Sequence, residues 1–125
     1  MMPERDPLTE KVIGIAIEVH RALGPGLLES ACREALCWDL NEPGLYVRKE
    51  VPLPVVYKGV KLDCGHRLDL VVEDRLIIEL KTVEKILPVH EARLLTYLRL
   101  SRIPLGLLLN FYSAVLMDGI KRMVL

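Results

Sequence analysis

Two apolar segments, residues 67–72 and 76–81, constrain the fold of this chain more than any other feature. They read Arg-Leu-Asp-Leu-Val-Val and Leu-Ile-Ile-Glu-Leu-Lys, and only three residues separate them. A strand whose side chains are apolar on both faces belongs inside a sheet that is covered on both sides. The two segments therefore predict neighbouring inner strands of an antiparallel hairpin, each with a carboxylate at its heart.

These carboxylates, Asp69 and Glu79, need a cation or a shared proton, because burying an unpaired charge costs several kcal/mol. If the loop has three residues, Val72 pairs with Leu76. In that register Asp69 lies opposite Glu79, with Cβ atoms about 4.5–5.5 Å apart. A two-residue loop would instead place Asp69 opposite Ile78 and turn Glu79 to the other face. We predict the three-residue loop, because it alone gives the carboxylates a shared site.

Lys81 lies two residues after Glu79 and therefore on the same face of its strand. Two carboxylates and a lysine on one face suit metal-assisted hydrolysis of a phosphodiester, because carboxylates are hard oxygen ligands for Mg²⁺. The metal polarises the phosphate and lowers the pKa of bound water. Lys81 would orient the attacking water or stabilise charge in the transition state. The spacing fits equally well an internal salt bridge that only neutralises Asp69 or Glu79.

Composition excludes several function classes. A chain of 125 residues is one domain, and 51% hydrophobic residues rule out intrinsic disorder. Lys+Arg and Asp+Glu number 17 each, which excludes a strongly basic domain that coats nucleic acid. Aromatic residues, at 5%, argue against a base-stacking platform. Several basic residues fall on the expected strands and turns: Arg48, Lys49, Lys58, Lys61, Arg67, Lys121 and Arg122. They are compatible with two interpretations, a local basic patch that binds a phosphate backbone and a solvated sheet edge of mixed charge.

The chain carries no sign of a membrane or secretory segment. No apolar run approaches the roughly 20 residues of a membrane span, and the N-terminus is polar and mixed in charge. The three cysteines, Cys32, Cys37 and Cys64, lack framework spacing and suggest reduced thiols. We expect a cytoplasmic protein with a flexible segment over residues 1–7 and one domain over residues 8–125.

Apolar spacing and Gly/Pro punctuation predict the order of the elements. Helices are expected over residues 8–23, 27–40 and 88–101. An edge strand over residues 45–51 should continue through residues 53–57, interrupted by Pro52 and Pro54. Residues 60–64, 67–72 and 76–81 should complete an antiparallel set, and residues 105–111 and 115–124 should close the sheet, the last strand with a turn or bulge at Asp118-Gly119. The fold class is α/β, a mixed sheet flanked by helices in a single compact domain.

The motif Gly26-Leu27-Leu28-Glu29-Ser30-Ala31-Cys32, taken with Asp69 and Glu79-Leu80-Lys81, resembles the GxxExxY protein family. That family is a compact branch of the PD-(D/E)XK nuclease superfamily. The resemblance covers nearly the whole chain and includes the stretches Val55-Val56-Tyr57-Lys58-Gly59 and His90-Glu91-Ala92 through Tyr97. It implies a restriction-endonuclease-like fold and a nuclease-like protein that hydrolyses phosphodiester bonds of nucleic acid with Mg²⁺ or Mn²⁺.

The resemblance also assigns residues to the site. It implies that Glu29, Asp69 and Glu79 bind the metal, and that these three act with Lys81 in catalysis. The proline that often precedes the aspartate is replaced by Leu68, as in other divergent branches.

Two positions depart from the family pattern. Cys32 stands where the family has its tyrosine, and Arg93 stands where a glutamine usually precedes Tyr97 by four residues. We expect Arg93 and Tyr97 to contact the substrate. Arg93 can reach outward to a phosphate or fold inward onto Asp69 or Glu79 and displace the metal, and we favour the outward pose.

Other side chains have simpler interpretations. Without the family, Glu29 would be read as an exposed helical ion pair with Arg33. His20 is expected to be a hydrogen-bonded core histidine, and Trp38 a packing residue or an interface anchor. Two rivals to the enzyme stay open: a degenerate nuclease fold that binds nucleic acid or protein, and a purely structural homodimer.

Overall fold

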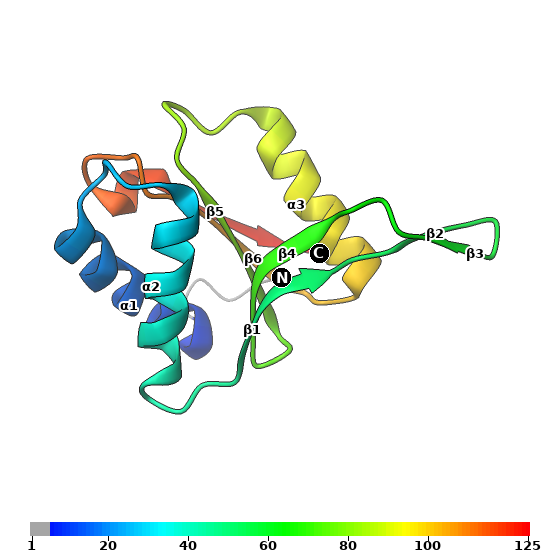
Figure 1. The fold of residues 1–125 in the computed structure, drawn as a ribbon, viewed down its shortest axis with the longest axis horizontal. Coiled ribbons are helices and arrows are strands. Elements are labelled where there is room, and N and C mark those ends of the chain that lie inside the picture. The colour runs from blue at the N-terminus through cyan, green and yellow to red at the C-terminus, as the bar shows by residue number, and fades with distance from the viewer. Residues whose placement is uncertain (1–5) are drawn as a thin grey trace.

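The computed structural model describes residues 6–125, and its helices sandwich a mixed β-sheet (Figure 1). The helices are α1 (Pro7–Leu23), α2 (Glu29–Asn41), α3 (Pro88–Ser101) and the short 3₁₀ helix η1 (Leu116–Gly119). The sheet has the order β1-β4-β5-β6-β7. Its strands are β1 (Val47–Pro52), β4 (Arg67–Val72), β5 (Leu76–Lys81), β6 (Leu105–Asn110) and β7 (Ile120–Val124). A separate hairpin consists of β2 (Val55–Tyr57) and β3 (Val60–Leu62).

Two apolar clusters lie on the two faces of this sheet. One joins α1 and α2 to side chains such as Leu70, Ile78 and Leu107. The other joins α3 to side chains such as Ile77 and Leu108. Strands β5 and β6 run parallel and are connected through α3, and both are buried nearly throughout, as their continuous apolar sequences predict. The fold class predicted from the sequence is confirmed.

The N-terminal helix is fixed by a cap. The Asp6 carboxylate accepts a hydrogen bond from the Thr9 amide at 2.9 Å, and Pro7 follows as the first helical residue. The flexible segment predicted for residues 1–7 falls largely on residues 1–5, which lie outside the described residues.

Strand β6 and helix α3 approach each other closely at a glycine. A Cβ at Gly106 would lie 3.1 Å from Leu94 Cδ2 and 3.2 Å from Leu98 Cδ2. The absence of a side chain at this position therefore allows α3 to pack tightly onto the sheet, next to the strand that carries Glu79.

Strands β4 and β5 and helix α3 have the predicted bounds, but three other expectations were wrong. Residues 53–57 do not continue the edge strand, and residues 60–64 do not join the antiparallel set. Pro52 ends β1 and Pro54 follows, so β2 and β3 leave the sheet and β1 pairs with β4 directly. The first half of the predicted last strand is the 3₁₀ helix η1, which ends at Gly119, so the chain does turn at Asp118-Gly119, as predicted, before β7 begins at Ile120. Among residues 6–125, no helix is long and apolar enough to cross a membrane.

Candidate active site

The β4–β5 hairpin has the three-residue loop that we predicted in order to place Asp69 opposite Glu79. Val72 pairs with Leu76, and the same register, continued along both strands, places Asp69 opposite Glu79. Regular strand pairing stops one residue before this point. The predicted juxtaposition of the two carboxylates is therefore confirmed, and it lies where the ladder between the two strands ends.

The two carboxylates replace the missing ladder by crossed hydrogen bonds to the opposite strand. Glu79 Oε1 accepts a hydrogen bond from the Asp69 amide at 3.1 Å. Asp69 Oδ2 accepts one from the Leu80 amide at 2.8 Å. Each side chain thus uses one oxygen to hold its position. The orientation of both carboxylates is fixed by the backbone.

Strand alternation is interrupted at Asp69. Leu68 packs in the cluster under α3, whereas Leu70 packs in the cluster under α1 and α2, although residues two apart in a regular strand share a face. The Asp69 carboxylate lies within reach of Arg33, which α2 carries. The break therefore brings Asp69 to the side of the sheet from which α2 approaches.

Arg33 is a site residue that the sequence interpretation missed. Its Nη1 lies 3.8 Å from Asp69 Oδ1, and its Nη2 lies 3.3 Å from Glu50 Oε1. Its Nε lies 3.7 Å from Glu34 Oε2, and this buried nitrogen makes no hydrogen bond to any described residue. The simple ion pair expected between Arg33 and Glu29 is not formed. Arg33 lies one helical turn after Glu29, so the two side chains share a face of α2. The motif that marks Glu29 as a site residue was therefore also a signal for Arg33.

Glu50 is the second residue that was missed. The β1–β4 register places it opposite Asp69, but the pair is skipped in the ladder, and Glu50 has a φ of 51°. This left-handed backbone is uncommon for a residue with a side chain. Carboxylates of three adjacent strands, Glu50, Asp69 and Glu79, thus follow one row across the sheet, and no sequence signal marked the first of them.

Burial and mutual repulsion dominate the electrostatics of the site. Glu79 is 8% exposed, and burial followed by the charge of Asp69 raises its pKa from 4.5 to about 8. Burial also raises the pKa of Asp69, although the hydrogen bond from the Leu80 amide opposes this. For Glu29, burial and then the charge of Asp69 raise the pKa. The fold therefore holds three carboxyl groups where their ionisation is unfavourable.

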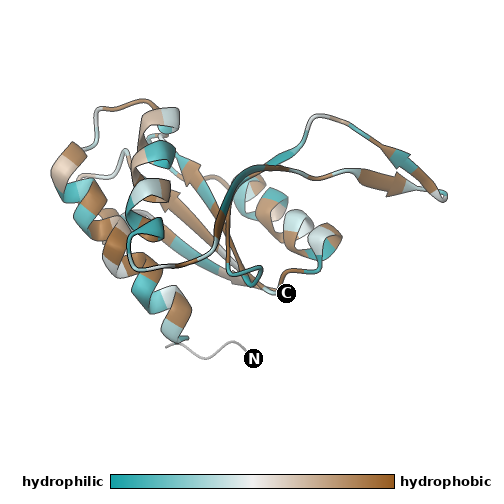
Figure 2. Ribbon diagram, turned by 60° about the horizontal axis from the view of Figure 1, so that its bottom comes forward, coloured by the Kyte–Doolittle hydropathy of each residue, from teal (hydrophilic) through white to brown (hydrophobic). Residues whose placement is uncertain are grey.

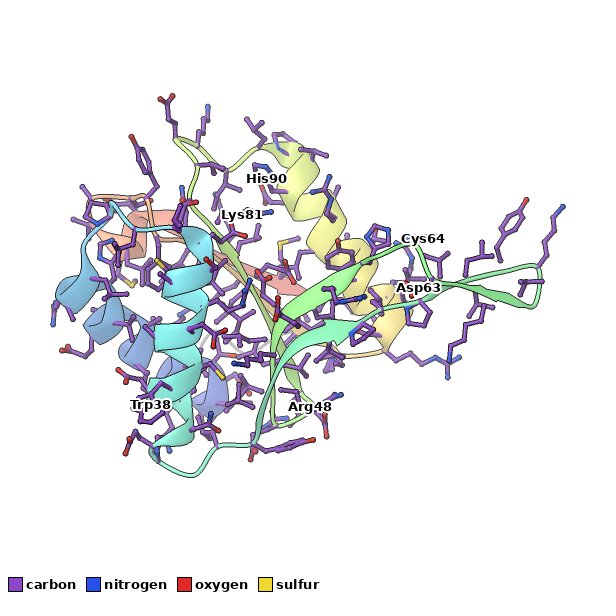
Figure 3. The ribbon with its side chains drawn as sticks, in the orientation of Figure 1. Trp38, Arg48, Asp63, Cys64, Lys81 and His90 are labelled. Carbon is purple, nitrogen blue, oxygen red and sulfur yellow. The ribbon has the colours of Figure 1, made fainter. Side chains whose placement is uncertain are left out.

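Lys81 is the last residue of β5, the strand that carries Glu79 (Figure 3). Its positive charge lowers the pKa of Glu29, Asp69 and Glu79, against the larger effect of burial on each. Within the described part of the chain it nevertheless makes no ion pair with them. The internal salt bridge that the spacing also allowed is therefore not formed among the described residues.

Helix α3 borders the site from the other side with Tyr97. The Tyr97 hydroxyl lies 3.3 Å from His66 Nδ1, and the two rings pack edge to face. Burial and then the charge of Glu79 raise the pKa of Tyr97.

Arg93 is exposed and does not take the inward pose. It lines a hollow of about 460 Å³ between α3 and β2, beside His66 and Tyr97. Within residues 6–125 the arginine that pairs with Asp69 is Arg33.

The remaining candidates lie away from the carboxylates or in the core. His20 is buried, and its Nε2 lies 2.8 Å from the Ser113 carbonyl oxygen, as expected for a core histidine. Trp38 is 71% exposed and so is not a packing residue. Cys32 is buried beneath Glu29, and burial and the Glu29 charge raise the pKa of its thiol.

The donor set of the site fits a hard divalent cation. Asp69, Glu79 and Glu29 offer carboxylate oxygens, the ligands that Mg²⁺ and Mn²⁺ prefer. Glu79 is a buried acid without a contacting cation, and a dication would relieve that cost. The carboxylates nevertheless do not form a ready-made cage, since no group of three or more His, Cys, Asp or Glu side chains within residues 6–125 is gathered as a metal site.

Comparison with known proteins identifies the superfamily. The family model for the PD-(D/E)XK nuclease superfamily matches residues 6–123, which includes all the carboxylates described above. No curated protein and no solved structure matches the chain. The match spans nearly the whole sequence, and the five-stranded mixed sheet between helices is consistent with it. The chain belongs to the PD-(D/E)XK nuclease superfamily.

Proposed function

We propose that this protein is a metal-dependent nuclease that hydrolyses phosphodiester bonds of nucleic acid. The observation that carries the proposal is the pair of carboxylates, buried Glu79 and half-buried Asp69, which crossed hydrogen bonds hold together where β4 and β5 meet, with the charge of Lys81 acting on both. Membership of the nuclease superfamily supports the same chemistry.

Asp69 and Glu79, with Glu29 as a third carboxylate, would hold Mg²⁺ or Mn²⁺. The bound ion would supply polarisation of the phosphate and a lowered pKa for water. Lys81 is positioned to stabilise negative charge that develops on the phosphate. Its ammonium group is not engaged by the neighbouring carboxylates, so it can serve the substrate.

Arg93 and Tyr97 would contact the nucleic acid on the α3 side. Arg93 is exposed beside the hollow next to Tyr97, where its guanidinium can bind a phosphate as a fork. The free cysteines Cys32, Cys37 and Cys64 support a cytoplasmic setting, and the motif around Glu29 supports the GxxExxY branch.

A cleavage assay tests the proposal. Labelled single- and double-stranded DNA and RNA are incubated with wild-type protein, Asp69→Asn and Lys81→Ala, with Mg²⁺, with Mn²⁺ and with chelator. We expect metal-dependent cleavage by the wild type and a loss of at least about a hundredfold in both variants. Lys11→Ala, an exposed lysine of α1, is the matched control and should cleave normally. Cleavage that survives in chelator or in Asp69→Asn would contradict the proposal.

A degenerate nuclease fold that only binds nucleic acid is the second candidate, and Arg33 favours it. This arginine brings a positive charge to within 3.8 Å of Asp69 Oδ1, an oxygen that would serve a metal. Mn²⁺ titration of wild type and Arg33→Gln separates the two candidates. Binding by the wild type supports the nuclease. Binding that appears only in Arg33→Gln, without cleavage by the wild type, supports the binding module.

A further inference from the structure

The β2–β3 hairpin, residues 55–62, projects from the body of the molecule as an arm (Figure 1). Val55 pairs with Leu62 and Tyr57 pairs with Val60. Directly opposed residues share a face, so one face of the arm carries these four apolar side chains and no polar one. Three of them are strongly exposed: Tyr57 at 58%, Val60 at 57% and Leu62 at 39%.

The arm is built for a protein partner. An isolated two-stranded hairpin is marginally stable in water, and this one has three residues in each strand. Its hydrophobic stretches lie away from the rest of the chain (Figure 2). An exposed apolar face of this kind marks a protein contact, because aliphatic groups offer nothing to a phosphate backbone.

The arm is also basic. Lys61 lies on the opposite face with Val56, and Lys58 lies at the turn with its ammonium 5.3 Å from the centre of the Tyr57 ring. Neither lysine makes an ion pair with any residue that the structure describes. The surface that covers the arm should therefore be apolar at its centre and acidic at its rim.

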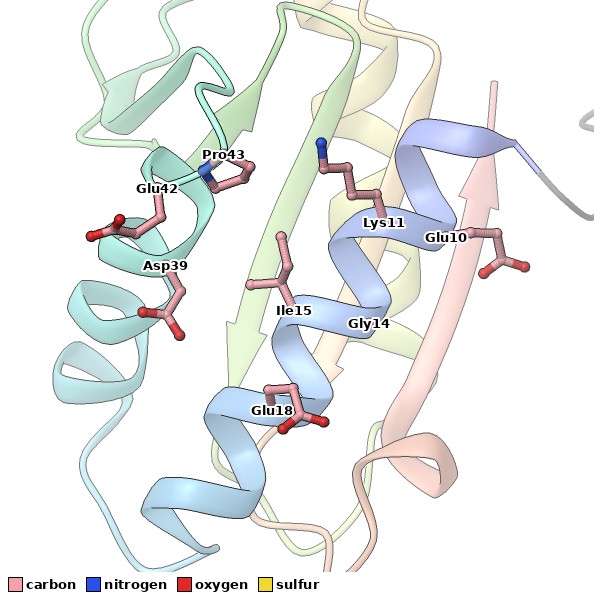
Figure 4. Close-up of a pocket in the computed structure, with 8 residues that line it drawn as sticks. All are labelled: Glu10, Lys11, Gly14, Ile15, Glu18, Asp39, Glu42 and Pro43. Atoms are coloured by element: carbon pink, nitrogen blue, oxygen red, sulfur yellow. The ribbon is translucent and has the colours of Figure 1, made fainter.

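The chain itself offers such a surface between α1 and α2 (Figure 4). This hollow of about 800 Å³, here called the α1–α2 groove, has apolar groups from Gly14, Ile15 and Pro43. Asp39 and Glu42 lie on its α2 side, and neither makes an ion pair within residues 6–125.

The α1 side of the groove is less strongly acidic. Glu10 and Glu18 lie there, but they are paired with Arg122 and Arg21 respectively. Lys11 is the basic residue of the lining. Asp39 and Glu42 are therefore the carboxylates left to meet an incoming cation.

Trp38 extends the groove. A second hollow of about 300 Å³ is lined by Trp38, Asn41 and Glu42, so the tryptophan adjoins the acidic rim. Exposed tryptophans are enriched among the residues that dominate binding at interfaces. Its 71% exposure, which packing within the chain does not explain, fits a role as the anchor of this surface.

We propose that the arm of one molecule docks in the α1–α2 groove of a second copy of this chain. The apolar face would meet Ile15 and Trp38, and Lys58 and Lys61 would meet Asp39 and Glu42. The arm and the helices α1 and α2 lie at opposite ends of the long axis (Figure 1). Two copies side by side in opposite directions can thus exchange both arms and close a two-fold dimer. The proposal does not depend on nuclease activity.

Charge reversal tests this docking by sedimentation velocity over a micromolar concentration series. Wild type should dimerise, whereas Lys58→Glu/Lys61→Glu and Asp39→Lys/Glu42→Lys should each weaken self-association by at least about tenfold. An equimolar mixture of the two variants should restore the dimer, because each arm then meets a groove of opposite charge. Lys85→Glu/Arg99→Glu, which reverses two exposed charges elsewhere, is the matched control and should dimerise like wild type.

Two results would overturn the proposal. One is a wild type that stays monomeric throughout the series. The other is a mixture of the reversed variants that fails to associate while both retain the circular dichroism of the wild type. If the arm variant instead loses nucleic-acid binding without any change in sedimentation, the arm serves the substrate. Trp38→Ser, an exposed change that leaves the core intact, should weaken the dimer as well.

Discussion

The substitution Glu79→Gln isolates the free energy of folding that is lost when an ionised carboxyl group is held in this site. Glu79 is buried opposite Asp69, and burial and the charge of Asp69 raise its pKa from 4.5 to about 8. Glutamine keeps the shape of the side chain and an oxygen that can accept the hydrogen bond from the Asp69 amide. It removes only the ionisation, so the variant should be the more stable protein wherever wild-type Glu79 is charged.

The sign and the size follow from linkage. A carboxyl group whose pKa is raised in the folded state contributes fully below its unfolded value of 4.5, and this stability is lost as the pH rises to about 8. Within that window the loss is about 1.4 kcal/mol per pH unit for one proton. The full effect above the folded pKa is on the order of 5 kcal/mol, which is comparable with the whole stability of a small domain. The raised pKa values of Asp69 and Glu29 act in the same direction.

Urea unfolding in chelator across this pH range measures the effect. Wild type and Glu79→Gln should have similar free energies of unfolding below pH 4.5, and the variant should be several kcal/mol more stable above about pH 8. Glu84→Gln, on an exposed loop, is the matched control and should follow the wild type. Parallel curves for wild type and Glu79→Gln would refute the reasoning, because they would mean that Glu79 ionises at no cost to folding.

Three further predictions concern the metal, the substrate and the fold. Millimolar Mn²⁺ should raise the melting temperature of the wild type and leave Asp69→Asn unchanged, since an ion stabilises only the state that binds it; an unchanged wild-type melt contradicts the metal site. Arg93→Gln should weaken nucleic-acid binding in a filter assay while Mn²⁺ affinity stays level, because Arg93 is exposed and does not contact Asp69; tighter Mn²⁺ binding would point to a metal-poor, degenerate protein. Gly119→Ala should destabilise the protein by about 1–3 kcal/mol in urea unfolding, because the new Cβ would lie 2.8 Å from the Asn110 carbonyl oxygen; Gly26→Ala, with nothing within 4 Å, is its control.

The inner hairpin was predictable because local rules decide it. The apolar runs fix β4 and β5 as buried strands, and the need to bring Asp69 to Glu79 selects the loop length, which the pairing of Val72 with Leu76 confirms. Helix α3 was predictable for a similar reason, since its opening proline and its packed leucines are both read along the chain.

The arm was not predictable from the same rules. Pro52 and Pro54 show that a strand is interrupted, but they do not say where the chain goes next. Residues 55–62 could join the sheet only by pairing with the free edge of β4. In the structure β1 pairs with that edge instead. This competition between distant segments has no signature in the spacing of either one. For η1, the close approach of Gly119 to Asn110 is likewise a contact between segments that the sequence does not display.

The candidate site shows the same division. The carboxylates of the site could be identified from the sequence, because burying a carboxylate in an apolar strand costs free energy that a partner or a function must offset. Their neighbours could not, since Arg33 reaches Asp69 only because strand alternation breaks between Leu68 and Leu70. A regular strand would have kept Asp69 on the α3 side. The outward pose favoured for Arg93 agrees with its exposed position, and the cation beside Asp69 comes instead from α2, as Arg33.

The crossed hydrogen bonds decide what Arg33 can do. Asp69 Oδ2 and Glu79 Oε1 are each held by an amide of the opposite strand, which leaves Asp69 Oδ1 and Glu79 Oε2 as the oxygens for a cation. The Arg33 nitrogen lies 3.8 Å from Oδ1, beyond the distance of a hydrogen bond, so it lowers the local negative charge without occupying the oxygen. Arg33 also approaches Glu50, at 3.3 Å, so its charge is divided between two carboxylates. Arg33 thus offsets part of the Asp69 charge, and its removal in Arg33→Gln should make Mn²⁺ binding tighter, because the ion no longer competes with a fixed cation.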